Sequence, residues 1–129
     1  MEFTLKANIK ATTKQIYKAW LSTQGHTKMT GGTAFTSDKV GDKFTAWSGY
    51  ITGENLVLEP YNRIVQSWRT SQFVEAENDS QIEITLIELN GETELTLTHS
   101  NVPESGEHYI KGWDEHYFQP MKAYFEYCK

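Results

Sequence analysis

The chain has 129 residues, with 38% hydrophobic, 13% aromatic and 22% charged side chains, a composition typical of one globular domain over residues 1–129. Its formal net charge is −5 and its lysines and arginines are scattered, which argues against binding of nucleic acid or of an anionic membrane surface. The N-terminus lacks a basic and apolar signal, and no segment has the length of a membrane span. We therefore expect a cytoplasmic protein without membrane insertion.

The N-terminal third predicts one strand and two helices. Residues 2–10 alternate between apolar and polar side chains, which indicates a half-buried strand. Thr12 and Gln15 have the spacing of a capping box before a helix of about three turns. A shorter helix is expected around His26 to Met29, ending at Gly31-Gly32.

After Thr33 the pattern changes to short strands divided by turn residues. The acidic segment from Val74 to Ser80 is expected to be an exposed loop. Six strands are predicted in this part of the chain: Ala34–Thr36, Lys43–Ser48, Tyr50–Glu59, Arg63–Thr70, Gln81–Leu89 and the run that follows Asn90-Gly91.

Asn90-Gly91 lies between two alternating runs and predicts a type I′ hairpin, because both residues tolerate a positive φ. The turn sets the register, which pairs Leu89 with Glu92 and Ile82 with His99. One face of the hairpin is then apolar and needs a cover: Ile82, Ile84, Leu86, Leu95, Leu97 and His99.

The last quarter of the chain predicts that cover, a long helix. Phe118 and Phe125 flank an apolar stripe with helical spacing, formed by Ile110, Trp113, Tyr117, Met121, Tyr124 and Cys128. Pro120 removes the backbone bond to the carbonyl of His116, so we expect a kink there. Trp113 should be buried against the sheet, with Gly112 permitting close approach.

Hairpin-connected strands with helices at both ends indicate an α+β fold rather than a doubly wound parallel sheet. The predicted architecture is a curved antiparallel sheet around the long C-terminal helix. Open space is expected between the concave face of the sheet and that helix.

Several strings of residues together resemble a known family, and the resemblance covers nearly the whole chain. They are Gly41-Asp42-Lys43-Phe44, Gly49-Tyr50-Ile51-Thr52-Gly53-Glu54, Leu58-Glu59-Pro60, Arg63-Ile64-Val65, Trp68-Arg69, Leu95-Thr96-Leu97-Thr98-His99 and Gly112-Trp113. The sequence is similar to the activator of Hsp90 ATPase homologue 1-like (AHSA1-like) branch of the START-like (SRPBCC) superfamily. The runs Asn90–Leu95 and Gly112–Phe118 are similar to the C-terminal domain of the family's eukaryotic Hsp90 co-chaperone.

The resemblance implies a START-like helix-grip fold whose cavity many relatives use for lipids, polyketides or other apolar molecules. It also implies a chaperone-related role in stress response, with an Hsp90-like chaperone as partner. In the eukaryotic co-chaperone a separate N-terminal domain supplies much of the contact with Hsp90. This chain begins at the first strand of the second domain, so we expect no ATPase stimulation by this chain alone.

The residues themselves do not predict an enzyme. We find no nucleophile with its base, no phosphate-binding glycine loop and no zinc-protease motif, and we expect no catalytic residue and no cofactor. The four histidines are spread over three elements and the one cysteine is Cys128, so we predict no metal site. Asp114 and Glu115 are interpreted as acidic residues at the start of the long helix, where they favour its N-terminus.

The predicted ligand pocket combines the apolar face of the hairpin with the aromatic residues nearby. It comprises Trp47, Trp68, Phe73, Ile84, Leu86, Leu97, His99, Trp113, Tyr117 and Met121. The same side chains could equally pack together as hydrophobic core and leave no cavity between the sheet and the helix. His99, placed near a strand end, has two interpretations: a structural hydrogen bond, which we favour, or a contact with the polar head of a ligand at the rim.

Three functions follow from these observations. The first is a binding domain for a small apolar molecule. The second is an accessory protein that docks on an Hsp90-like chaperone through its surface. The third, with the weakest support, is a cyclase-like enzyme that acts on an apolar substrate.

Overall fold

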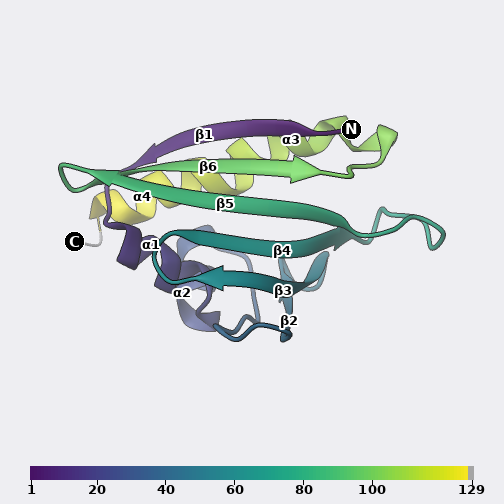
Figure 1. The fold of residues 1–129 in the computed structure, drawn as a ribbon, viewed down its shortest axis with the longest axis horizontal. Coiled ribbons are helices and arrows are strands. Elements are labelled where there is room, and N and C mark those ends of the chain that lie inside the picture. Colours follow the sequence, from purple (N-terminus) through teal and green to yellow (C-terminus); the bar gives the residue numbers. More distant parts are fainter. Residues whose placement is uncertain (128–129) are drawn as a thin grey trace.

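A six-stranded antiparallel sheet curves around a C-terminal helix in the computed structural model, which describes residues 1–127 (Figure 1). The order of strands across the sheet is β1-β6-β5-β4-β3-β2, so β1 and β2 form its two edges. The strands are β1 (Phe3–Ile9), β2 (Lys43–Ala46), β3 (Ile51–Glu59), β4 (Arg63–Thr70), β5 (Ser80–Leu89) and β6 (Glu92–Ser100).

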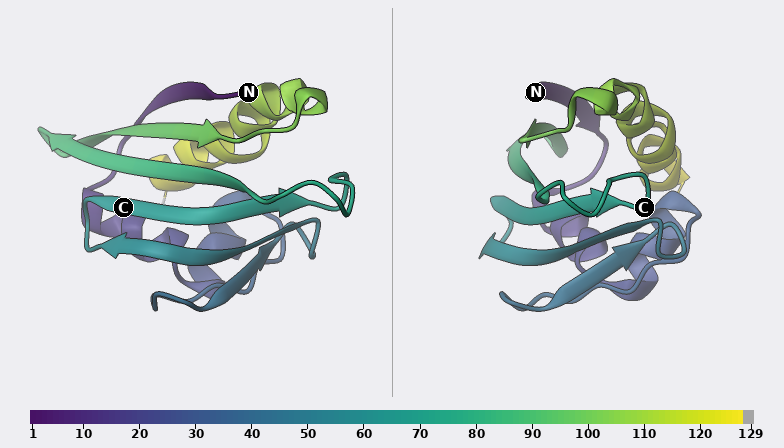
Figure 2. Two further views of the ribbon diagram at one scale, coloured as in Figure 1. Left: turned by 45° about the vertical axis from the view of Figure 1, so that its right-hand side comes forward. Right: turned by 90° about the vertical axis from the view of Figure 1, so that its right-hand side faces the viewer.

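Two short helices and one long irregular helix complete the α+β fold. The short ones are α1 (Thr13–Trp20) and α2 (Thr23–Thr30). The C-terminal helix lies across one face of the sheet, as the two turned views in Figure 2 show, and consists of η1 (Glu104–Glu107), α3 (His108–Trp113), η2 (Asp114–Phe118) and α4 (Gln119–Tyr127). None of the helices in the described part of the chain has the length and apolar character needed to cross a bilayer.

The hairpin between β5 and β6 confirms the predicted register. Asn90 and Gly91 have φ values of 57° and 79°, as a type I′ turn requires. Leu89 pairs with Glu92, and Ile82 pairs with His99 at the other end of the ladder. The predicted apolar face of this hairpin is buried and forms the centre of the core.

The capping box before α1 is confirmed, although the helix has eight residues and is shorter than the three turns predicted. Thr12 accepts a bond from the backbone N–H of Gln15, and the Gln15 side chain accepts one from the N–H of Thr12, so the capping box is complete. The second helix is longer than predicted and ends at Gly31, whose φ of 86° is the left-handed conformation common at helix ends.

The prediction of a strand at residues 34–36 is wrong. Only Phe35 makes a β-bridge there, with Thr45, so five strands rather than six follow the short helices. The reason lies in α2, where the hydroxyl of Thr23 bonds both backbone groups of Thr36, and that of Thr27 bonds both backbone groups of Ala34. The helix therefore occupies the groups that a strand would need for pairing.

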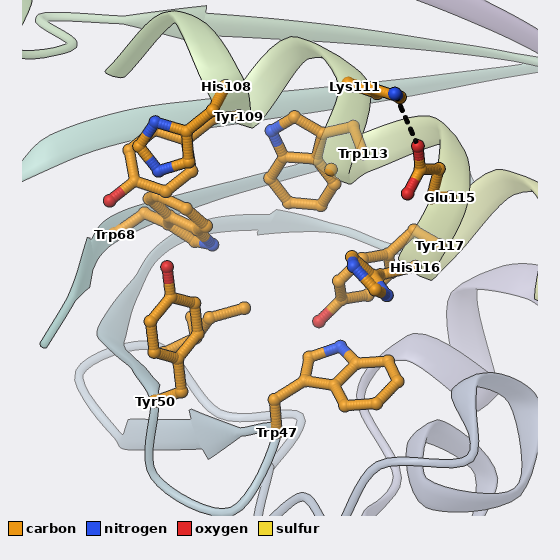
Figure 3. A pocket seen from close by; sticks show the side chains of 12 residues that line it. Trp47, Tyr50, Trp68, His108, Tyr109, Lys111, Trp113, Glu115, His116 and Tyr117 are labelled. Atoms are coloured by element: carbon orange, nitrogen blue, oxygen red, sulfur yellow. Dashed lines mark ion pairs between the residues drawn. The ribbon is translucent and has the colours of Figure 1, made fainter. Parts of the chain in front are cut away.

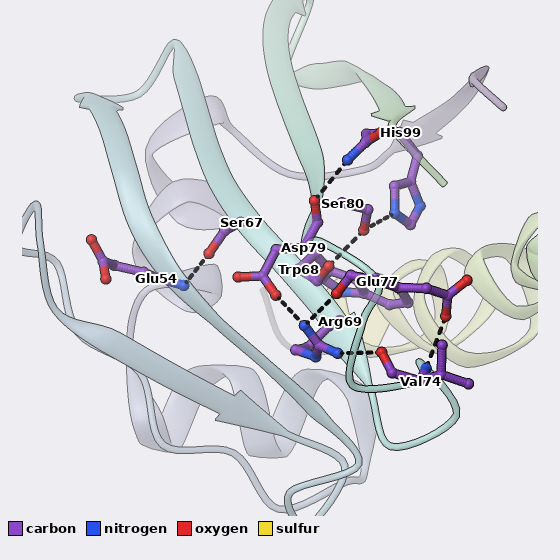
Figure 4. Close-up of polar contacts among 10 residues, drawn as sticks. Glu54, Ser67, Trp68, Arg69, Val74, Glu77, Asp79, Ser80 and His99 are labelled. Atoms are coloured by element: carbon purple, nitrogen blue, oxygen red, sulfur yellow. Dashed lines mark hydrogen bonds and ion pairs between the residues drawn. The ribbon is translucent and has the colours of Figure 1, made fainter. Parts of the chain in front are cut away.

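The predicted acidic loop joins β4 to β5, except that Ser80 begins the strand instead of ending the loop. Arg69 holds the loop by an ion pair of 2.8 Å with Asp79 and by hydrogen bonds to the carbonyls of Val74 and Glu77 (Figure 4). The loop is thus attached at both of its halves to the end of β4.

The C-terminal helix departs from the prediction at its start. It begins at Glu104, so Asp114 and Glu115 lie in its middle and do not interact with its N-terminus. Asp114 instead accepts a bond of 2.7 Å from the Gln119 side chain, and Glu115 forms an ion pair of 3.5 Å with Lys111. These carboxylates stabilise the helix locally rather than through its dipole.

A π-helical turn, η2, lies where the kink near His116 was predicted. The N–H of Gln119, the residue before Pro120, donates to the carbonyl of Asp114, five residues back. A wide turn of this kind shifts the helical phase, because it inserts an extra residue. The buried stripe consequently follows a spacing of four residues through Tyr109, Trp113, Tyr117, Met121 and Phe125.

One predicted stripe residue is wrong, because of the two residues one turn before Trp113 it is Tyr109 that packs against Trp68 and Phe73. Ile110 is 36% exposed, whereas its neighbour Tyr109 is buried. Trp113 is buried as predicted, with 2% of its surface exposed. The predicted place of Cys128 at the end of the stripe lies outside the described residues.

Candidate binding cleft

An open cleft of about 470 Å³ lies between the segment Trp47–Ile51 and the C-terminal helix (Figure 3). Its size is in the range of small-molecule sites, which usually measure about 300–1,000 Å³. Aromatic side chains dominate its wall, which is lined by Trp47, Tyr50, Ile51, Trp68, His108, Tyr109, Lys111, Gly112, Trp113, Glu115, His116 and Tyr117.

Trp47 is held at the cleft by an unusual backbone. It has a φ of 51°, followed by 57° at Ser48 and 87° at Gly49, and a positive φ is rare for a bulky residue. Its ring packs edge-on against that of His116 at 5.4 Å. The same indole also packs on Gly32, where an added Cβ would be only 2.4 Å from the ring. The turn and Gly32 together position this wall of the cleft.

The opposite wall is the helix, and Gly112 gives it a flat surface. A Cβ at this position would meet no atom within 4 Å, so the predicted close approach of Gly112 to the sheet is wrong. The absence of a side chain instead leaves space in the cleft. Lys111 and Glu115, one turn apart on the same helix, place an ion pair on this wall (Figure 3).

Polar groups join the two walls at one end of the cleft. The Tyr50 hydroxyl donates to the side-chain oxygen of Gln72, which also lies 3.0 Å from Nε2 of His108. The hydroxyls of Tyr109 and Thr70 bond each other, and burial raises the pKa of Tyr109 to about 12. This end of the cleft is therefore bridged from the sheet to α3.

A buried histidine supports the other end of the cleft. Nδ1 of His26 lies 2.9 Å from the carbonyl of Trp20, so this nitrogen carries the proton, and Nε2 accepts a bond of 3.0 Å from the Tyr117 hydroxyl. Burial lowers the pKa of His26 and raises that of Tyr117. Both shifts keep the pair neutral, which makes it a poor acid and base near pH 7.

His99 lies behind the cleft rather than at its rim. It is 0% exposed, and the rim position given in one interpretation of the sequence is wrong. Its Nδ1 accepts a bond of 3.1 Å from the indole of Trp113, and its Nε2 donates to Ser80 at 2.8 Å. The Ser80 hydroxyl in turn donates to the carbonyl of Trp68 at 2.6 Å (Figure 4).

This chain of bonds needs a neutral imidazole, since a second proton on His99 would leave no acceptor for the Trp113 indole. Burial, with a smaller effect from the N-terminal amine, lowers the pKa of His99 to about 3. The structural interpretation of His99 is the one that fits these contacts.

The predicted pocket residues separate into two groups. Trp47, Trp68, Trp113 and Tyr117 line the cleft. The remaining predicted residues are buried and do not line it: Phe73, Ile84, Leu86, Leu97, His99 and Met121.

Sequence reasoning missed Tyr50, Tyr109 and the other lining residues outside its set, which are Ile51, His108, Lys111, Gly112, Glu115 and His116. Tyr109 would have been found by extending the stripe of Trp113 and Tyr117 backward in steps of four residues. Tyr50 carries no such signal, because its place depends on how the turn after β2 folds.

The described residues contain no cluster of three or more histidine, cysteine, aspartate or glutamate side chains suited to a metal ion. His108 and His116 both line the cleft on the helix, where His108 bonds Gln72 and His116 packs on Trp47.

Comparisons with known proteins agree with the fold. A human protein named activator of 90 kDa heat shock protein ATPase homolog 1 is 29% identical over 127 residues. These residues are 98% of this chain but only 37% of the human protein, so the chain spans about a third of that relative.

Two solved structures have the same architecture over nearly their whole length. An Hsp90 activator from Plasmodium falciparum has a TM-score of 0.79 and 25% identity, with 92% of this chain and 91% of that chain covered. The Aha1 dimer from Colwellia psychrerythraea has a TM-score of 0.83 and 20% identity, with 100% and 98% covered. The model of the family described as activator of Hsp90 ATPase homolog 1-like protein matches residues 10–126, and the chain belongs to this family.

Proposed function

We propose that this domain binds a small, mainly apolar molecule in the cleft between Trp47 and the C-terminal helix, and that it acts by binding rather than by catalysis. The observation that carries the proposal is an open space of about 470 Å³ whose wall includes six aromatic side chains, Trp47, Tyr50, Trp68, Tyr109, Trp113 and Tyr117.

Apolar burial would supply most of the affinity, at about 25 cal/mol for each Å² of apolar surface removed from water. The wall is also well supported, since Trp68 packs against Tyr109 and Trp113 at ring distances of 5.0 and 5.5 Å. A rigid aromatic wall loses little conformational entropy when a ligand enters.

Titration with the fluorescent probe 1-anilinonaphthalene-8-sulfonate tests this function, with Gly112→Leu as the decisive variant. The new side chain would extend into the cleft without meeting the core, because no atom lies within 4 Å of the added Cβ. We expect saturable binding by the wild type and a loss of affinity of about tenfold or more in Gly112→Leu, since a filled pocket excludes the probe.

The matched control is Lys122→Leu, which adds the same side chain at an exposed position of α4 that does not line the cleft. It should bind the probe as the wild type does. A wild type without saturable binding, or a Gly112→Leu variant that binds normally, would contradict the proposal.

A second candidate function is accessory docking on an Hsp90-like chaperone, which the names of the relatives favour. The measurement is phosphate release by a cognate Hsp90 with and without micromolar domain. Gly112→Leu separates the two functions, because it fills the cleft and leaves the exposed surfaces of the sheet unchanged. Several-fold acceleration by both wild type and variant would support docking without a role for the cleft.

A further inference from the structure

Three residues of the C-terminal helix, spaced by four, line the cleft: His108, Gly112 and His116. Residues four apart lie on the same side of a helix. An added Cβ at Gly112 would meet no atom within 4 Å, so the middle position leaves space in the cleft. The two histidines lie on either side of this space, and each of them contacts the opposite side of the cleft.

A contact between two rings closes the cleft at His116. The His116 ring packs edge-on against that of Trp47, with 5.4 Å between the ring centroids. The Trp47 indole in turn packs on Gly32, where an added Cβ would lie 2.4 Å from the ring. Trp47 therefore has little room to move away from His116.

A hydrogen-bonded strap of three side chains, Tyr50, Gln72 and His108, closes the cleft at its other end. The Tyr50 hydroxyl donates to the side-chain oxygen of Gln72, and Nε2 of His108 lies 3.0 Å from the same oxygen. Nδ1 of His108 lies 3.1 Å from the carbonyl of Ser105, which holds the orientation of the imidazole. The strap thus joins the turn after β2 to the start of α3.

The two closures limit the length of the cleft, as Figure 3 shows with Tyr50 and His108 on one side and Trp47 and His116 on the other. The two histidines are eight residues apart, which is about 12 Å at the rise of an α-helix. A longer molecule would have to separate Trp47 from His116 or break a hydrogen bond of the strap. The strap is the weaker closure, because its side chains are exposed and their hydrogen bonds compete with water.

Resting on the proposed function, we infer that the cleft takes a compact ring system in preference to a long alkyl or acyl chain, and that the strap sets this limit. The ligand lies over Gly112, between the two histidines. Gln72 is then a residue that determines specificity, although it does not itself line the cleft.

The test compares two saturated alcohols as competitors of the fluorescent probe, decahydro-2-naphthol and 1-decanol. They have the same number of carbon atoms and neither is aromatic, so stacking on the cleft wall does not distinguish them. Apolar area alone favours 1-decanol, because the chain has more surface than the fused rings. We expect the opposite order in the wild type, since the extended chain is longer than the distance between the two closures.

Gln72→Ala removes the centre of the strap without changing a residue that lines the cleft. The affinity for 1-decanol relative to decahydro-2-naphthol should rise about fivefold, the value of one neutral hydrogen bond. If this variant does not fold by circular dichroism, Tyr50→Phe removes one bond of the strap, keeps the ring and should change the ratio in the same direction. Gln81→Ala, at an exposed position of β5 outside the cleft, is the matched control and should leave the ratio unchanged.

If both alcohols displace the probe but 1-decanol binds the wild type more tightly, the inference is wrong and the proposed function stands. The same conclusion follows if the ratio in Gln72→Ala equals that of the wild type. If neither alcohol displaces the bound probe, the proposed function fails, and the inference fails with it.

Discussion

The two sides of Trp113 show how the same residue types serve two purposes. On the sheet side its indole joins a closed chain of bonds through His99 and Ser80 to the carbonyl of Trp68, and each group has a partner. On the other side lies the cleft, an open space of about 470 Å³ that the Trp113 ring lines together with other aromatic side chains. The first region is closed by its own hydrogen bonds, and the second keeps an open space that the proposed ligand would fill.

This difference predicts whether a substitution should change the stability of the fold or the binding of a ligand. Changes in the closed region should reduce the free energy of unfolding, because they leave a buried group without its partner. Changes in the cleft should alter binding and affect stability little, or even increase it.

Truncation of Trp113 should have the largest effect. Trp113→Ala removes a side chain that is 2% exposed and leaves His99 without its donor. We expect a loss of about 3–5 kcal/mol in the free energy of unfolding, as for other large buried aromatic residues. Urea denaturation followed by circular dichroism measures it, and a loss below about 1 kcal/mol would contradict the role of Trp113 in the core.

Acid should destabilise the closed region through His99. Its pKa is near 6.5 in the unfolded chain and about 3 in the folded one, so the unfolded state binds the proton first as the pH falls. The contribution is complete above pH 6.5 and is lost between about pH 6.5 and 3, by up to about 1.4 kcal/mol per pH unit. Buried His26, whose pKa is also lowered, adds a loss of the same sign.

Denaturant melts at several pH values compare the wild type with His99→Gln, which keeps a donor and an acceptor but does not titrate. The variant should show a shallower loss of stability in acid. Equal slopes for the two proteins would mean that His99 is not held neutral by the fold.

An added methyl group at Gly32, which packs against Trp47, should have a moderate effect on the free energy of unfolding. In Gly32→Ala the new methyl group would lie 2.4 Å from the indole, so the ring must move. We expect a loss of about 1–3 kcal/mol, as for other overpacked sites, together with weaker probe binding. Thermal unfolding and probe titration measure the two effects, and a variant that loses neither would show that Gly32 does not position Trp47.

The smallest effect, at Gly112, should be a gain rather than a loss of stability. Gly112→Ala adds a methyl group that meets no atom within 4 Å, at a helical position of the cleft wall. Replacing glycine by alanine inside a helix stabilises it by about 0.5–1 kcal/mol. A small rise in melting temperature is expected, whereas a clear fall would show that the helix here requires glycine.

Local signals predicted much of the fold. The Asn90-Gly91 hairpin, its register and the Thr12 capping box depend on residues close together in the chain, and each is confirmed. The segment at residues 34–36 was misjudged because its pattern is that of a strand, while its bonding partners lie on α2. No property of the segment itself indicates those partners.

The cleft was predicted only in part, for a related reason. Apolar periodicity identifies which residues leave water, and it does not distinguish a filled core from the wall of a cleft. The partners of His99 come from β5 and from α3, so its burial could not be read from the hairpin alone. Likewise Tyr109 and Ile110 both lie one turn before Trp113, and it is the contact of Tyr109 with Trp68 on the sheet that buries Tyr109 and leaves Ile110 exposed.

The indole region of the ¹H–¹⁵N spectrum tests the central claim most directly, because the chain has four tryptophans and each N–H gives one signal. Trp47→Phe and Trp68→Phe assign the two cleft signals. On titration with 1-anilinonaphthalene-8-sulfonate those two should shift and saturate together, because both rings line the cleft, while the signals of Trp20 and Trp113 move less. Shifts confined to Trp20 and Trp113, with the cleft pair unchanged, would contradict a ligand site between Trp47 and Trp68.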